Sequence, residues 1–319
     1  MVAAQAVALD LMTLLGAPGV GPSRARKILE LWQLAGRARP LLDESLTREA
    51  LTGPQAAALP QSRERAQRSW DELSAKSVHA LSIIDPAYPA DLKTSLGERA
   101  PLLILCIGNA KLLAAASVGF CGSREATEKG MTTARQSAQM LAHESINIVS
   151  GFAAGVDMNA HRAALAAGGT TTIVLAEGIL RFRVKREIAD EWDDKRTLVV
   201  SEFGPNLPWS VGHAMQRNRT ICGLSRAMIL IEARAEGGSI QAGRECLKIG
   251  LPLFAAVYEG MPESATGNQE LLRHGARPLM KSRSTNQPNM RRLLDSISGP
   301  RPSLEPAAAA PQRQYQPAG

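Results

Sequence analysis

The chain has 319 residues, of which 45% are hydrophobic and 21% charged, a composition typical of a folded globular protein rather than a disordered or fibrous one. Its formal net charge of +7 favours polyanionic partners without choosing among nucleic acid, nucleotide and membrane surface. The four cysteines are scattered without metal-ligand spacing, the N-terminus does not resemble a signal peptide, and no apolar run is long enough to span a bilayer. We therefore expect a cytoplasmic protein without a metal site, a disulfide framework or a membrane span.

Residues 1–76 show the spacing of amphipathic helices on both sides of a Gly/Pro-rich turn. The turn, GAPGVGPSRA, resembles a helix-hairpin-helix, in which backbone N–H groups meet a DNA phosphate. An ordinary connection between two helices explains the same residues equally well. We predict a helical N-terminal domain over 1–76 and leave its contact with DNA open.

From residue 77 to residue 296, short apolar runs alternate with glycine turns and helical segments. Eight runs are predicted strands, at residues 79–84, 101–108, 117–122, 146–151, 170–178, 196–204, 226–233 and 251–260. This alternation indicates βαβ units with right-handed crossovers. We predict an α/β fold, in which a parallel sheet carries helices on both faces.

The last part of the sequence changes composition. Residues 297–319 are rich in Pro, Ala and Gln, which predicts a disordered tail. Residues 273–292, just before it, contain six lysines and arginines and no acid. This run is either a solvated surface or a guide for a polyanion.

Four turns that contain glycine or an acid follow predicted strands: CGSRE, SGFAAGVD, SEFG and EARAEGGS. Ligands bind beyond the carboxyl ends of parallel strands, so these turns should share one rim of the molecule. Gly122 lets the backbone approach a ligand, and Arg124 offers a forked charge suited to phosphate. Gly238 and Ser239 begin another helix, where free N–H groups favour an anion. A tight turn with an exposed arginine would also explain the first motif.

Asp157 and His161 follow the second of these turns. Asp157 stands where it could cap the next helix, and His161 lies one turn later on the same face, so the two side chains could interact. No nucleophile or metal set accompanies them, which favours a structural histidine over a general base. We interpret both as supports of a binding pocket.

Motifs of common enzymes are missing. The chain has no G-x-x-x-x-G-K-[ST] loop, no G-x-G-x-x-G before a helix, no G-x-S-x-G elbow and no cluster of carboxylates for two metals. Several candidate anion-binding turns without a reactive side chain suggest binding rather than catalysis. We predict a protein that is not an enzyme and needs no cofactor.

The motifs GSR, SGFAAGVDMNAHRAAL, GGTTTIVLAEGI, VVSEF, RNRTICGLSRAMILIEA and GSIQAG occur in the order and spacing of the DprA/Smf family of DNA-processing proteins. The resemblance covers about residues 83–279 and implies an extended Rossmann-like fold. It also implies a protein, commonly a homodimer, that binds and protects single-stranded DNA and helps to load the RecA recombinase in natural transformation. By position, the resemblance implies a DNA- or phosphate-binding pocket lined by Gly122, Ser123, Arg124, Ser150, Gly151, Arg217, Asn218 and Arg219.

The sequence also departs from the family. RFRVKR replaces the usual Tyr-Pro, which adds cations, and the S-G-S-L-x-T-A element becomes GGSIQAG. Aromatic residues make up only 4% of the chain, so base stacking must depend on a few side chains. Phe120, Phe152 and Phe203 are candidates near the rim, although a core position is the favoured explanation for each of them.

Two other functions remain open. A nucleotide phosphoribohydrolase would carry P-G-G-x-G-T-x-x-E, and EGGSIQAGRE lacks the proline and the threonine and has its acid, Glu245, out of place. A nucleotide-binding sensor in a stress or phage-defence system fits the glycine turns and the basic residues.

Overall fold

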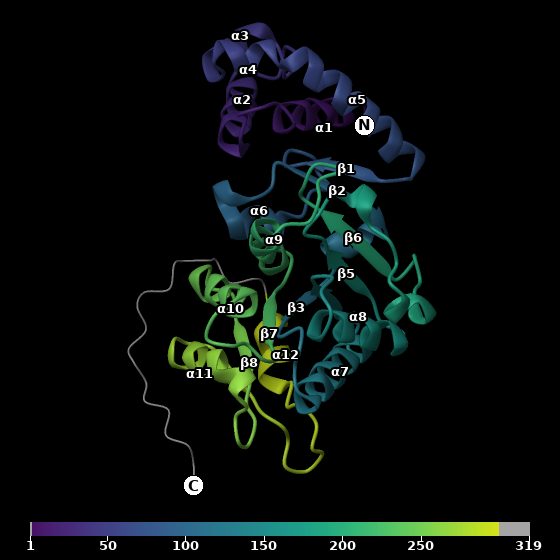
Figure 1. Cartoon of the computed structure of the whole chain (residues 1–319), viewed down its shortest axis with the longest axis vertical. Helices are drawn as coiled ribbons and strands as arrows, with labels where there is room; N and C mark the ends of the chain where they lie inside the picture. Colours follow the sequence, from purple (N-terminus) through teal and green to yellow (C-terminus); the bar gives the residue numbers. More distant parts are fainter. Residues whose placement is uncertain (1, 300–319) are drawn as a thin grey trace.

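The computed structural model describes residues 2–299 and begins with a group of helices (Figure 1). They are α1 (Val2–Leu15), α2 (Pro22–Leu34), α3 (Glu44–Ala50), α4 (Gly53–Ala57) and α5 (Leu59–Ala75). Pro22 starts α2, where a missing N–H costs no helical hydrogen bond. In the preceding glycine-rich turn, the Gly19 carbonyl accepts hydrogen bonds from Arg24 and Gln55. The turn is therefore tied to α2 and α4.

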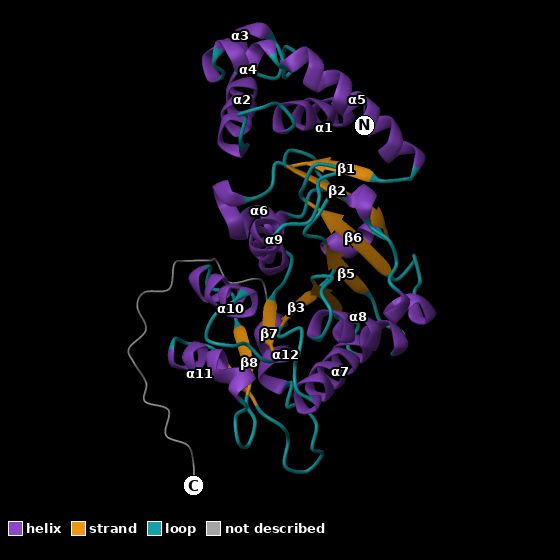
Figure 2. Cartoon of the chain, in the orientation of Figure 1, coloured by secondary structure: helices purple, strands orange, loops and turns teal. Residues whose placement is uncertain are grey.

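A mixed sheet fills the middle of the molecule (Figure 2). Within residues 2–299 its strands are β1 (His79–Ser82), β2 (Leu103–Gly108), β3 (Ser117–Cys121), β4 (Asn147–Ser150), β5 (Thr171–Val174), β6 (Thr197–Ser201), β7 (Ala227–Leu230), β8 (Leu253–Ala256) and β9 (Arg277–Leu279). Their order is β1-β2-β6-β5-β4-β3-β7-β8-β9. All neighbours from β6 to β9 are parallel, whereas β2 runs antiparallel to both β1 and β6.

Helices cover both faces of the sheet (Figure 1). One face carries α7 (Glu128–His143), α8 (Val156–Ala166) and α12 (Arg291–Ile297), and the other carries α6 (Ala90–Leu96), α9 (Val211–Gly223), α10 (Gly238–Lys248) and α11 (Thr266–Arg273). Successive strand residues point to opposite faces, so Ile229 packs with the first group while Met228 and Leu230 pack with the second. The strands are buried on both sides, as their continuous apolar runs predict.

The N-terminal helices share their core with the sheet. Leu11 and Leu14 of α1 belong to the apolar cluster under α9 and α10. Ala8 and Met12, on another side of α1, pack in the cluster that contains Leu105 of β2. The helical group therefore closes the β1–β2 end of the sheet.

The predicted α/β fold is confirmed, and each of the eight predicted strands is present in the structure. The predicted parallel sheet is confirmed from β6 to β9, whereas β2, at one end, runs antiparallel to β1 and β6. A strand's residues reveal its burial, but its direction depends on the connections around it. The short strand β9 is absent from the prediction because three residues that include Pro278 show no periodicity.

The predicted tail, 297–319, lies outside the described residues from position 300 onward. Ile297 is buried and ends α12, so the first residue of the predicted tail is packed against the protein. The division into domains at residues 76 and 77 stays a prediction. No helix between residues 2 and 299 has the length and hydrophobicity needed to cross a bilayer.

Candidate nucleic-acid interface

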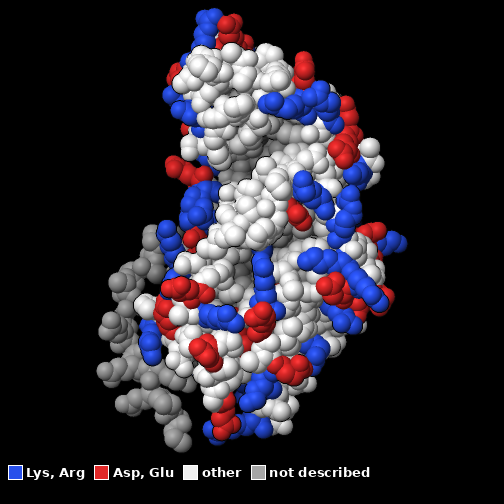
Figure 3. All heavy atoms as spheres, viewed as in Figure 1, with Lys and Arg blue, Asp and Glu red and all other residues white. Residues whose placement is uncertain are grey.

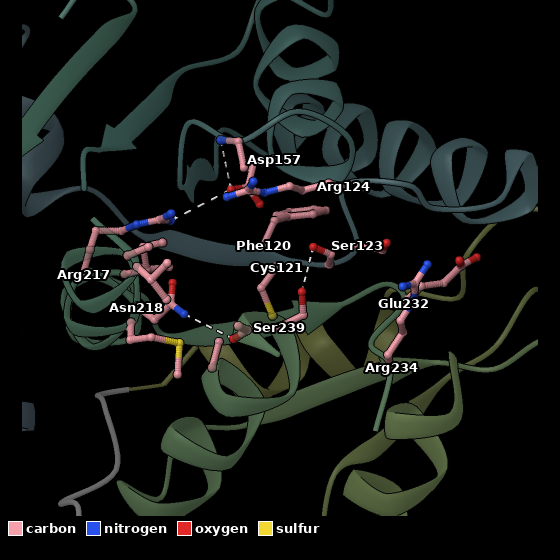
Figure 4. A pocket seen from close by; sticks show the side chains of 18 of the residues that line it. Phe120, Cys121, Ser123, Arg124, Asp157, Arg217, Asn218, Glu232, Arg234 and Ser239 are labelled. Carbon is pink, nitrogen blue, oxygen red and sulfur yellow. Dashed lines mark hydrogen bonds and ion pairs between the residues drawn. The ribbon is translucent and has the colours of Figure 1, made fainter. Parts of the chain in front are cut away.

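A pocket of about 470 Å³ opens beyond the carboxyl ends of β3 and β7 (Figure 4). The chain proceeds from β3 to β6 on one side and from β7 to β9 on the other, so β3 and β7 form the topological switch point of the sheet. Open α/β sheets bind their ligands at this point. We call the cavity the switch-point pocket. Of the predicted site residues, those that line it are Gly122, Ser123, Arg124, Asp157, Arg217, Asn218, Gly238 and Ser239.

Two glycines bring the loops of the pocket together. A β-carbon at Gly122 would collide with the side chain of Val156 at the start of α8. Gly155 has φ 81° and lies against the carbonyl groups of Ser123 and Arg124, where a β-carbon would also collide. The loops after β3 and β4 can therefore pack closely only with glycine at these positions.

Arg217 forms the buried wall of the pocket (Figure 4). Its side chain is 9% exposed, and its guanidinium fills the space that a β-carbon at Gly151 would need. The only carboxylate within ion-pair distance among residues 2–299 is that of Asp157, 3.9 Å from Nη1, and Nε has no hydrogen-bond partner. Buried guanidinium donors normally find partners, so Arg217 is prepared for an anion.

Asp157 lies at the second position of α8, after the N-cap Gly155. Its predicted capping role is wrong, because the N-cap position belongs to the glycine, although Oδ2 accepts a 3.4 Å hydrogen bond from the Ala153 N–H. Burial raises the pKa of Asp157, while the nearby guanidinium of Arg217 acts in the opposite sense. Asp157 thus faces Arg217 rather than the predicted partner, His161.

His161 supports the pocket from behind. It is fully buried, with Nε2 2.6 Å from the Gly151 carbonyl oxygen and Nδ1 2.6 Å from the Thr171 hydroxyl. Burial lowers the pKa of His161 to about 4, so the ring is neutral at pH 7. The Gly151 carbonyl oxygen can only accept, so Nε2 carries a proton, while the Thr171 hydroxyl lies within hydrogen-bond distance of both Nδ1 and the Ile148 carbonyl oxygen, which is 2.9 Å away. Ser150, also fully buried, donates to the Phe120 carbonyl oxygen.

Asn218 and Ser239 join the two sides of the pocket. The Asn218 amide donates to the Gly238 carbonyl oxygen over 3.2 Å, and the Ser239 hydroxyl donates to the Gly122 carbonyl oxygen over 2.8 Å. These bonds connect α9 with the start of α10 and α10 with the end of β3. The N–H groups in the first turn of α10 therefore lie at the pocket.

Arg219 does not line the pocket. Arg217, Asn218 and Arg219 lie in the middle of α9, where successive side chains diverge by about 100°. Arg219 is exposed on the other side of the helix, and its charge acts on Glu202, which accepts hydrogen bonds from Gln216 and Thr220. Adjacent positions in the sequence thus have different surroundings.

The predicted stacking residues are mostly in the core. Phe120 is fully buried, and Phe203 is buried with its ring 4.5 Å from that of His213. Phe152 is half-buried, with Lys185 over its ring at 4.3 Å. None of the three offers a free aromatic face at the pocket.

The exposed aromatic residue of the pocket is Trp209, which the sequence did not single out. It is 48% exposed, and the Arg124 guanidinium carbon lies 5.9 Å from its ring centre. Exposed Val211 and Met215 adjoin it in the lining. No local pattern in the sequence marks Trp209, because its place in the site depends on where the loop between β6 and α9 leads.

Charges of both signs surround the mouth of the pocket. Arg234 pairs with Glu125 over 3.4 Å, and Glu236 is exposed beside them. Glu232 is fully buried and accepts hydrogen bonds from Thr127 and Ser264. The visible face of the molecule likewise shows Lys and Arg interspersed with Asp and Glu rather than a single basic surface (Figure 3).

The fold and the pocket define an extended Rossmann-like protein with a cavity at its switch point. Residues 79–287 match the family described as DNA recombination-mediator protein A, and the chain belongs to this family. It is 34% identical over 199 residues to DNA processing protein DprA of Streptococcus pneumoniae, which covers 62% of this chain and 70% of that protein. It is 27% identical to protein Smf of Escherichia coli over 67% of this chain and 57% of that protein.

Solved structures agree with this assignment. The X-ray structure of DprA from S. pneumoniae superposes with a TM-score of 0.72 at 29% identity, over 85% of this chain and 94% of that one. A structure of DNA processing protein A from Helicobacter pylori has a TM-score of 0.56 at 25% identity, over 70% and 97% of the two chains. That structure is described as showing a unique single-stranded DNA binding mode.

Proposed function

We propose that this protein binds single-stranded DNA with a backbone phosphate in the switch-point pocket and acts as a DNA-processing protein in recombination. The observation that carries the proposal is the Arg217 guanidinium, which is buried, faces the pocket and has an unpartnered Nε. A phosphate oxygen in the pocket would accept hydrogen bonds from this guanidinium. Amides at the start of α10 would add further donors.

A strand of nucleic acid suits the mouth of this pocket. Trp209 offers a partly exposed aromatic ring in the same pocket lining as Arg217, with the Arg124 guanidinium carbon 5.9 Å from the ring centre. Bases of single-stranded DNA stack on such faces, whereas the bases of a duplex are paired and stacked internally. The net charge of +7 favours the approach of a polyanion.

The wider role follows from family membership. We propose that the bound strand is incoming or exposed DNA in natural transformation, that the protein protects it, and that a RecA-type recombinase takes it over. In this proposal the protein acts as a homodimer in the cytoplasm and catalyses no reaction. Gly122, Ser123, Arg124, Arg217, Asn218, Gly238 and Ser239 contact the DNA, while Ser150, Gly151, Asp157 and His161 hold the pocket in shape.

The proposal is tested by fluorescence anisotropy with labelled oligo-dT and the matching duplex, at about 50 and about 200 mM salt. We expect preference for the single strand and a steep loss of affinity with salt. Arg217→Met should weaken binding about tenfold or more, since it removes a charge-assisted hydrogen bond. Trp209→Ala should weaken it by a similar factor.

Arg219→Ala is the matched control, because it removes an arginine from the same helix outside the pocket. Equal losses in Arg217→Met and Arg219→Ala would mean that bulk charge, and not the pocket, holds the strand. No binding to either DNA by the folded protein would overturn the proposal and favour a nucleotide-binding sensor.

A further inference from the structure

The switch-point pocket contains more carboxylates than arginines. Its lining includes Arg124, Arg217 and Arg234 and also Glu125, Asp157, Glu232 and Glu236. Such a balance differs from the excess of positive charge that a highly charged phosphate ligand requires. The distribution of these charges therefore indicates which kind of phosphate the pocket accepts.

Most of the other charged side chains in the pocket lining already have partners within the protein. Glu125 pairs with Arg234 at the exposed rim, over 3.4 Å. Glu232 accepts hydrogen bonds from the Thr127 backbone and hydroxyl and from the Ser264 hydroxyl. At the buried end of the pocket, this leaves Asp157 and Arg217 facing each other.

The geometry of that pair is important. Asp157 Oδ2 lies 3.9 Å from Arg217 Nη1, which is an ion pair but too long for a hydrogen bond. The carboxylate therefore offsets the charge of the guanidinium while leaving its donors available. Both side chains are about nine-tenths buried, so water screens the interaction little. A ligand meets free N–H groups in an almost neutral environment.

We propose that Asp157 makes the switch-point pocket selective for singly charged phosphodiesters over doubly charged phosphomonoesters and nucleoside polyphosphates. This inference rests on the proposed function and names the class of phosphate that the site takes. A diester within a strand carries one negative charge, whereas a terminal phosphate carries nearly two at neutral pH. The second charge would approach the Asp157 carboxylate, with only Arg124 at the mouth to compensate. The pocket thereby distinguishes a DNA strand from free nucleotides.

The test compares two competitors that differ by one charge, thymidine 5′-monophosphate and its monomethyl ester. Each displaces labelled oligo-dT from the full chain at constant ionic strength. At a pH of about 7.5 the ester should compete about tenfold better, because a like charge within about 4–6 Å changes an equilibrium by this factor or more. At a pH of about 5, below the second phosphate pKa of about 6, the two should compete equally.

Asp157→Asn should improve competition by the monophosphate about tenfold more than competition by the ester at neutral pH, because the removed carboxylate repels two charges in the first ligand and one in the second. Asp71 is exposed on α5, in the N-terminal helices and outside the pocket lining. Asp71→Asn makes the same change in net charge and serves as the control. Thermal unfolding of each variant shows whether it is folded, and the comparison of esters on the unaltered protein does not depend on a variant.

A monophosphate that competes as well as the ester at neutral pH, or no displacement by either compound, overturns the selectivity. An unchanged preference in Asp157→Asn shows that the carboxylate is not its cause. If oligo-dT itself does not bind, the proposed function fails first, so the two failures are distinguished.

Discussion

At the scale of single residues, the guanidinium of Arg217 and the absence of a side chain at Gly151 depend on each other. The guanidinium occupies the volume that a β-carbon at position 151 would fill. Since this end of the arginine side chain is flexible, a methyl group there would displace it rather than break the backbone. Gly151 therefore controls the position of a charge without carrying one.

Gly151→Ala tests this dependence. We expect affinity for oligo-dT to fall about tenfold, because the displaced guanidinium loses a charge-assisted hydrogen bond to the phosphate. The free energy of unfolding should change by only about 1 kcal/mol. Gly204→Ala, in a nearby loop with nothing within 4 Å of the added methyl, should leave both unchanged. Unaltered binding by Gly151→Ala would remove Arg217 from the interface.

His161 predicts how stability depends on pH. Its pKa is about 4 in the folded protein and about 6.5 in the unfolded chain, because burial disfavours the charged ring. A lowered pKa stabilises the fold above pH 6.5, and this contribution is lost as pH falls toward 4. This difference between the folded and unfolded pKa values corresponds to about 3 kcal/mol of folding stability.

We therefore expect denaturant titrations to show the protein losing more stability between a pH of about 7 and about 4.5 than His161→Gln does. The glutamine amide can still donate to the Gly151 carbonyl oxygen, so the variant should fold. Carboxylates with raised pKa values, such as Asp157 and Glu202, act in the opposite direction in both proteins and cancel in the comparison. Parallel pH profiles would show that His161 does not titrate in this range.

At the scale of secondary-structure elements, α11 is joined to the ends of two strands by one side chain. The Asn268 amide donates to the carbonyl oxygens of Ile231 and Ala256, and its oxygen accepts from the Ala233 N–H. These bonds satisfy backbone groups at the carboxyl ends of β7 and β8, where the hydrogen bonds between the two strands end. The side of the sheet that carries the switch-point pocket depends on this connection.

Asn268→Ala should lower the free energy of unfolding by about 3 kcal/mol, since it removes three hydrogen bonds to buried backbone groups. Gln269→Ala, the exposed neighbour on the same helix, should change it by less than about 0.5 kcal/mol. Chemical denaturation measures both. A small effect at Asn268 would mean that water replaces its amide.

At the scale of the whole molecule, the N-terminal helices and the sheet share apolar clusters. Leu11 of α1 is fully buried in the cluster that also holds Leu198 of β6 and Cys222 of α9. Because a common core couples the parts, their unfolding should be cooperative even though the sequence suggests two domains.

Calorimetry should therefore show a single transition. Leu11→Ala, which removes about 3 kcal/mol of buried packing, should lower the melting temperature of that one transition. An early transition that moves alone in the variant would show that residues 1–76 unfold independently. The exposed Leu34, at the end of α2, provides a control substitution without loss of packing.

The sequence by itself determined the elements and the chemistry of the rim. Apolar runs and glycine turns predicted strands at the correct places, since burial and left-handed turns leave marks on the residues themselves. Most of the predicted pocket residues, such as Gly122, Ser239 and Arg217, do meet at one cavity, because the carboxyl ends of parallel strands lie on one edge.

Only the tertiary structure decided the details on which the function depends. Arg217 and Arg219 look equivalent in the sequence, but helical geometry buries one in the pocket and exposes the other. Trp209 became part of the site because its loop leads to the pocket, and no local pattern marks such a position. The antiparallel β1 and β2 follow from chain connections. The direction of a strand, the side of a helix that faces the pocket and the distance between two side chains depend on packing between segments that are remote in the sequence. Local sequence patterns therefore do not reveal them.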